Sequence, residues 1–336
     1  MKILYRTLFW MILPTGFIAC HNDPLKINIS SIREEVPVIR YDKELYNLGT
    51  NPSAEEINKF YERYPEFTDL FTWQIIRIGD IRDSSGMHSI TAFNNDTVVQ
   101  KLAEIVDQQF NGLDEEVKKL VKAFKHYRYY FTDKKLPTIY TCISDFNESV
   151  FTSEGIVGIS LDKYLGGSCK YYPLLGIPRY KLRKMISEMI PVDVMYCWGM
   201  TEFEISKEAT SLLDHIIHEG KLWYFTEAML PGTADTLLTG FTARQLKWCK
   251  GNEKEMWNYL IENKLLFSTK QMDIVRYIND GPTTNGFPPG SPSRTGAWLG
   301  RQIIRNYMKK NPGIGLAQLM QNTQYQDILN KSGYMP

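Results

Sequence analysis

The sequence lacks an excess of charge of either sign, and it lacks the common catalytic signatures. It has 39 lysine and arginine residues against 38 aspartate and glutamate residues, so its formal net charge is only +1. This balance gives no electrostatic reason to expect nucleic acid as a partner. The sequence also contains no G-x-S-x-G, Walker A or dinucleotide-binding glycine pattern. The usual hydrolase, nucleotide-binding and dehydrogenase signals are therefore absent.

No apolar run reaches the roughly 20 residues of a membrane-spanning helix, but a shorter run lies at the start of the chain. Lys2 and Arg6 precede the apolar residues 7–13, and Ala19 precedes Cys20. This order is typical of a bacterial lipoprotein signal peptide. We therefore expect residues 1–19 to be cleaved and Cys20 to be acylated, which anchors the mature protein to a membrane.

The segment after Cys20 lacks secondary-structure signals. Residues 20–37 are polar and include two prolines, so we expect a lipidated tether. Residues 21–23 form no acidic cluster, which favours the periplasmic face of the outer membrane over the cell surface. The sequence thus predicts a lipid-anchored protein of the cell envelope.

Cysteine is scarce in the rest of the chain. The four remaining cysteines are widely spaced and form no C-x-x-C pair, which argues against structural zinc and thioredoxin-type chemistry. Disulfides and buried free thiols stay equally open. The four residues are Cys142, Cys169, Cys197 and Cys249.

The hydrophobic pattern predicts an α+β fold that is mainly helical. Amphipathic helices are expected at 97–110 and 113–124, and β-branched runs at 137–143, 149–151 and 155–161 predict a small sheet. Beyond Pro178 the pattern is helical, with helices expected at 179–199, 204–230, 242–250, 253–265, 270–278, 294–310 and 315–332. We expect one domain over 38–336, with an α+β part at about 38–166 followed by a helical part at about 167–336.

The pattern most suggestive of chemistry is D-H-I-I-H-E-G-K at 214–221. Residues three and four apart share a helix face, so His215, His218 and Glu219 could converge on a zinc ion. The order H-x-x-H-E differs, however, from the H-E-x-x-H of zinc metalloproteases and from its inverted form. The simpler interpretation pairs Asp214 with His218 and leaves His215 half-buried.

A second pattern, at 294–307, combines arginines with small residues. Gly296 and Gly300 lie four apart on an expected helix, where they would let another helix approach closely. Arg294, Arg301 and Arg305 could bind carboxylates. Close packing is the simpler interpretation, and a binding role for the arginines is the alternative.

Several stretches together resemble, in order and spacing, the GldB family of gliding-motility lipoproteins of the Bacteroidetes. The resemblance covers nearly the whole mature chain and includes the signal peptide with its Cys20. The other matching pieces are residues 39–45, 129–131, Pro137, 159–166, 212–221, 229–231, 246–248, Trp257 and 294–308.

The resemblance implies a zincin-like fold, because the GldB family is itself similar to zincin metallopeptidases. In zincins, a small sheet precedes an active-site helix with H-E-x-x-H, and a later helix supplies a glutamate ligand followed by glycine. Glu219-Gly220 resembles the later element. The expected active-site helix, 179–199, contains no histidine, and Glu188 and Asp193 are its only plausible ligands. The resemblance therefore implies a zincin-like scaffold that has no catalytic activity and no metal cofactor.

We accordingly expect a lipid-anchored accessory protein that binds a protein partner in the cell envelope, in association with gliding machinery. Two alternatives stay open. One is a metal-dependent hydrolase with a divergent site at His215, His218, Glu219 and Asp193, with zinc as the candidate metal. The other is a lipoprotein that binds a peptide or glycan. The candidate pocket residues are Asp193, His215, His218, Glu219, Lys221, Arg294 and Arg301.

Overall fold

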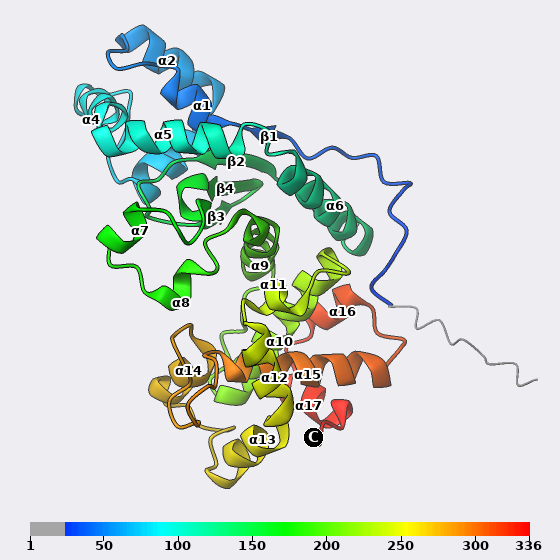
Figure 1. The fold of residues 1–336 in the computed structure, drawn as a ribbon. Helices are drawn as coiled ribbons and strands as arrows, with labels where there is room; N and C mark the ends of the chain where they lie inside the picture. The colour runs from blue at the N-terminus through cyan, green and yellow to red at the C-terminus, as the bar shows by residue number, and fades with distance from the viewer. Residues whose placement is uncertain (1–23) are drawn as a thin grey trace, which may run out of the picture.

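The computed structural model describes residues 24–336 and confirms an α+β, mainly helical fold (Figure 1). The sheet has the strand order β1-β2-β4-β3, with β1, β2 and β4 parallel and β3 antiparallel at one edge. Every residue of β4 is buried, as expected for an inner strand of a covered sheet. The strands are β1 (Val38–Ile39), β2 (Thr138–Cys142), β3 (Val150–Ser153) and β4 (Ile156–Ser160).

The N-terminal half surrounds a small aromatic core. Tyr41 and Phe71 pack around Phe67, whose ring stacks on Tyr140 of β2 with 4.3 Å between ring centroids. The two amphipathic helices expected here are present as α5 and α6. The helices of this half are α1 (Tyr41–Tyr46), α2 (Ala54–Arg63), α3 (Pro65–Asp69), the π-helix η1 (Leu70–Ile75), α4 (Ser84–Asn95), α5 (Thr97–Phe110) and α6 (Asp114–Tyr130).

The C-terminal half is helical and is centred on α10. Helix α9 packs against β3 and β4 and also against α10, and α10 packs against α15 (Figure 1). The close approach expected at Gly296 and Gly300 occurs: Gly300 lies against the backbone of α10, and Gly296 lies against Tyr277 of α14 and Ile216 of α10. The elements are η2 (Leu161–Tyr164), α7 (Tyr171–Leu174), α8 (Arg179–Leu182), η3 (Ser187–Met189), α9 (Ile190–Glu202), α10 (Leu212–Met229), α11 (Asp235–Thr239), α12 (Ala243–Gly251), α13 (Glu253–Glu262), α14 (Gln271–Ile278), α15 (Thr295–Lys310), α16 (Leu316–Gln321) and α17 (Tyr325–Ser332).

Three predicted helix boundaries are wrong. The helix expected at 179–199 is interrupted, because Ile186 is extended and forms a β-bridge with Leu165, and α9 starts only at Ile190 with a proline in its first turn. The helix expected from residue 204 begins at Leu212, where Ser211 and Asp214 form a capping box. The helix expected at 315–332 is divided into α16 and α17.

The described residues bear on the expected membrane anchor and on the cysteines. The expected signal peptide and Cys20 lie outside the described residues, and within residues 24–336 no helix is long and apolar enough to cross a membrane. The four other cysteines are free thiols, which decides between the two alternatives left open by the sequence. They are Cys142, Cys169, Cys197 and Cys249.

Candidate functional site

A cleft of about 610 Å³ lies where the edge strand β3 meets α9 and the α7–α8 segment. The antiparallel pairing of β3 leaves it at the sheet edge, and α9 packs directly against it. The cleft contains charged groups as well as exposed apolar side chains, Leu175 and Met200 among them. Further lining residues that bear on its chemistry are Glu148, Lys163, Tyr164, Lys181, Lys184, Asp193, Tyr196, Cys197 and Asp280.

Asp193 is the predicted site residue that lines this cleft directly. Its Oδ2 accepts a hydrogen bond of 2.9 Å from the hydroxyl of the buried Tyr164. Desolvation raises the pKa of Asp193 to about 6, although the Tyr164 bond and the charges of Lys184 and Arg294 oppose this shift. The carboxyl group therefore changes its charge close to neutral pH.

The carboxylate of Glu219 lies behind the wall of the cleft and is fully engaged. The hydroxyl of Tyr196 donates to its two oxygens at 3.1 and 2.8 Å, and Arg294 forms an ion pair with Oε2 at 3.1 Å. The guanidinium group of Arg294 also lies over the rings of Trp223 and Tyr196, at 4.8 and 5.2 Å from their centroids. These contacts fix the Glu219–Tyr196–Arg294 cluster in one arrangement.

Arg294 adopts an unusual backbone conformation to reach this position. It has φ of 57° in the left-handed region and is the N-cap of α15. A non-glycine residue in this region costs roughly 1 kcal/mol. The ion pair and the cation–π contacts of its side chain offset that cost.

The two histidines of the 214–221 segment do not join Glu219 in a metal site. His218 points toward α17, with its ring perpendicular to that of Tyr325 and 6.4 Å away, and burial lowers its pKa to about 4. His215 is partly buried, and desolvation lowers its pKa as well. No group of three potential ligands placed to hold a metal ion occurs in residues 24–336. Of the two carboxylates in the proposed set, Glu219 already pairs with Arg294 and Asp193 bonds to Tyr164, so these residues do not fit a zinc ion.

The simpler interpretation of Asp214 was also wrong in detail. Its Oδ2 accepts from the backbone N–H groups of Thr210 and Ser211, so it caps α10 instead of pairing with His218.

Lys221 and Arg301 lie away from the cleft. The Lys221 side chain is buried, donates to the carbonyl oxygen of Asn322 at 2.8 Å and lies over the Tyr325 ring. Desolvation lowers its pKa to about 8. Arg301 does bind carboxylates, but they belong to the chain itself. It pairs with Glu227 at 3.0 Å and with Asp235 at 2.7 Å.

Sequence reasoning missed the residues that surround Asp193. Tyr196 and Cys197 follow it by three and four positions in α9, so helical spacing alone places them on the same face. The Cys197 thiol faces the edge strand, near the carbonyl oxygen of Val150 and the hydroxyl of Thr152. Burial raises the pKa of this thiol, which disfavours the reactive thiolate.

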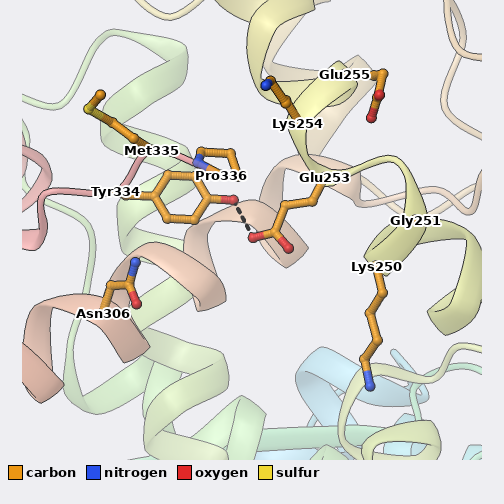
Figure 2. A pocket seen from close by; sticks show the side chains of 9 residues that line it. All are labelled: Lys250, Gly251, Glu253, Lys254, Glu255, Asn306, Tyr334, Met335 and Pro336. Carbon is orange, nitrogen blue, oxygen red and sulfur yellow. Dashed lines mark hydrogen bonds between the residues drawn. The ribbon is translucent and has the colours of Figure 1, made fainter.

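A second hollow, of about 370 Å³, lies beside the C-terminus (Figure 2). The hydroxyl of Tyr334 donates to Glu253 at 2.7 Å across it, and Lys250 and Lys254 lie along the α12–α13 side. None of the predicted site residues lines this hollow.

Taken together, the fold and the cleft define a mainly helical α+β domain whose charged cleft lies between a sheet edge and a central helix. The family model described as gliding motility protein GldB matches residues 22–336. The chain therefore belongs to the GldB family of gliding-motility proteins, and this membership agrees with a lipid-anchored location in the cell envelope. No curated protein and no solved structure gives a significant match.

Proposed function

We propose that this GldB-family chain is a lipid-anchored accessory protein that binds a protein partner in the cleft between β3 and α9 and catalyses no reaction. The observation that carries the proposal is the engagement of Glu219 by Tyr196 and Arg294. The carboxylate that would act as a metal ligand in a zincin holds a guanidinium group here, so the cleft keeps its shape without metal chemistry.

The other reactive groups of the cleft support the same proposal. Cys197 has a raised pKa, and no histidine lines the cleft to act as its base. Asp193 could exchange a proton near pH 6, but general acid–base catalysis also needs a group that polarises or attacks the substrate. The order of a small sheet, α9 and then α10 further supports the resemblance to a zincin scaffold that has lost its histidine ligands.

The cleft has features that suit an extended segment of a partner protein. β3 is an edge strand, and edge strands accept a further strand through backbone hydrogen bonds. Met200 and Leu175 are about half exposed, at 47% and 52%, and present apolar surface at the cleft. A partner segment with apolar side chains would cover them.

Recovery of the partner from a membrane fraction tests this proposal. The tagged lipoprotein should recover an envelope protein, and the variant Met200→Glu should recover roughly tenfold less of the same protein, because the introduced charge would be desolvated on binding. Met272→Glu is the matched control, since Met272 is also exposed but lies on α14. Equal recovery by wild type and Met200→Glu would place the partner elsewhere.

Metal analysis tests the non-catalytic part. Protein purified without chelator should carry no stoichiometric zinc, and His215→Ala and His218→Ala should not change its metal content. Zinc at one equivalent in the wild type, lost in both variants, would support the hydrolase alternative instead.

A further inference from the structure

The segment that precedes the sheet is docked on the domain. Leu25 and Val36 are buried in the main core, and Glu34 forms an ion pair with Arg128 of α6 at 3.4 Å. Between them Ile27 and Ile29 are partly buried, whereas the residues that alternate with them are exposed. Over residues 25–30 this alternation is that of an extended chain with one face on the protein, and a turn at residues 30 and 31 follows it. We call residues 25–36 the strap. In Figure 1 it runs from β1 past α6.

The outer end of the strap lies at the turn between α10 and α11. The Cε atom of Lys26 is 4.0 Å from the position that a Cβ on Gly232 would occupy. Cys20 precedes Leu25 by five residues, and an extended chain spans at most about 3.6 Å per residue. An acyl group on Cys20 must therefore enter a membrane within about 18 Å of Leu25.

The surface at this end has the chemistry of a membrane contact. A groove of about 360 Å³ lies here, and its lining includes the buried Met229 and Leu230 and the partly exposed Pro231. Lys119 and Lys122 are exposed at the groove, and neither forms a salt bridge within the described part of the chain. Glu188 is the single acidic residue in its lining.

His126 adds a polar group to the same groove. Its side chain lines the groove and is only 7% exposed, and its Nδ1 has no hydrogen-bond partner among residues 24–336. A buried imidazole nitrogen without a partner can bond to a ligand oxygen or hydroxyl group. Apolar walls beneath two lysines and an imidazole suit a phosphate headgroup with the upper part of its acyl chains.

We propose that the strap holds this face against the membrane and that the groove between Lys119, Lys122 and Pro231 binds an anionic phospholipid. The inference rests on the lipid anchor of the proposed function. It also leaves the cleft accessible, because α9 contributes Pro191 and Val192 to the groove but Tyr196 and Met200 to the cleft.

The first experiment measures lysine labelling in the mature acylated protein. The protein is placed in detergent micelles, in phosphatidylcholine vesicles, and in vesicles that also contain phosphatidylglycerol. An amine-reactive reagent then labels it, and mass spectrometry gives the rate for each lysine. Lys26, Lys119 and Lys122 should react about fivefold more slowly in the anionic vesicles than in micelles. Lys250 and Lys254, at the other hollow (Figure 2), should react at one rate throughout. If Lys26, Lys119 and Lys122 also react as fast in the anionic vesicles as in micelles, the proposal is overturned.

Two variants then separate the roles of charge and strap. Protection here means slower labelling in the anionic vesicles than in micelles. The double variant Lys119→Glu/Lys122→Glu should abolish the protection of Lys26, whereas the double variant Lys250→Glu/Lys254→Glu should preserve it. A flexible Gly/Ser insertion between residues 23 and 24 should also abolish it, because the bilayer is then no longer held at this face. Protection that survives the first variant would overturn the phospholipid site, and protection that survives the insertion would overturn the orienting role of the strap.

Intact mass and thermal unfolding complete the test. Acylated, folded protein without protection would overturn this inference alone, whereas a chain that carries no acyl mass would overturn the lipid anchor of the proposed function as well.

Discussion

Gly220 in α10 and Gly300 in α15 bring two helix backbones into direct contact. A Cβ on Gly300 would lie 1.9 Å from the carbonyl oxygen of Ile216, and a Cβ on Gly220 would lie 2.3 Å from the carbonyl carbon of Gly300. Neither neighbour is a flexible side chain that could move aside. The contact positions Arg294 at the start of α15 against Glu219 of α10, so the packing of the helices and the ion pair depend on each other.

Gly300→Ala should therefore destabilise the protein by about 2 kcal/mol or more, because one added methyl group forces the helices apart. Chemical denaturation of the two proteins measures the difference. Gly251→Ala is the control, since a Cβ there has no atom within 4 Å, and alanine is favoured over glycine in a helix. Equal stability of Gly300→Ala and wild type would show that the helices separate without cost.

Gly300 and its neighbour Gly296 show what the sequence could predict. The four-residue spacing of Gly296 and Gly300 indicated a close helix contact, and the contact is there. The capping box of Thr242 and Gln245 was also predictable, because it depends on residues three apart. Strands β2, β3 and β4 followed from short β-branched runs, whereas β1 was not among the predicted strands. Each of these signals is local.

The site depended on contacts that local spacing does not specify. The spacing of His218 and Glu219 allowed both to bind one metal ion. In the structure, however, Glu219 accepts a hydrogen bond from Arg294, 75 residues away, and the His218 ring contacts that of Tyr325. Likewise, the break before α9 depends on a bridge between Ile186 and Leu165 that no helical pattern contains. Contacts with residues distant in sequence therefore determine the orientations of Glu219 and His218 and the start of α9.

Arg301 should be far more important to stability than its neighbour Arg305. The Arg301 side chain is 1% exposed and pairs with Glu227 and Asp235, whereas Arg305 is 37% exposed. Arg305 also pairs with both carboxylates, so Arg301→Ala would leave them with only this half-exposed partner. The variant would also empty the buried space that the Arg301 side chain fills, and together the two losses should cost about 3 kcal/mol. Arg305→Ala should cost about 1 kcal/mol or less. Thermal unfolding of the two variants checks the ranking, and equal losses would contradict it.

Asp193 should make the protein less stable as the pH rises through about 6. Burial raises its pKa above that of the unfolded chain, so the folded protein retains a proton that the unfolded chain releases. Its stabilising effect is complete below the unfolded pKa of about 3.8 and is lost through pH 6. Asp193→Asn should then gain on the order of 3 kcal/mol over wild type at pH 8 and almost nothing at about pH 3.

Tyr164→Phe gives a second readout of the Asp193 carboxyl group. The hydrogen bond from Tyr164 opposes the rise in pKa, so its loss should move the transition to a higher pH. An NMR titration of the Asp193 carboxyl carbon in both proteins measures this. The same midpoint in wild type and Tyr164→Phe would mean that the bond does not favour the charged carboxylate.

His218 should make the protein less stable as the pH falls, which is opposite to the effect of Asp193. Burial, assisted by the charges of Lys221 and His215, lowers its pKa from 6.5 to about 4. As the pH falls from 6.5 to 4, the unfolded chain therefore takes up a proton that the folded protein does not, and stability is lost. This loss should amount to roughly 2 to 3 kcal/mol.

His218→Phe and His218→Gln both remove the titration but differ in packing against Tyr325. A shared reduction in acid sensitivity would assign the effect to the proton, because only the proton is common to the two variants. Denaturant unfolding between pH 7 and 4 gives the free energy of unfolding at each pH. If this free energy falls equally steeply with pH in wild type and in both variants, His218 is not the group that titrates.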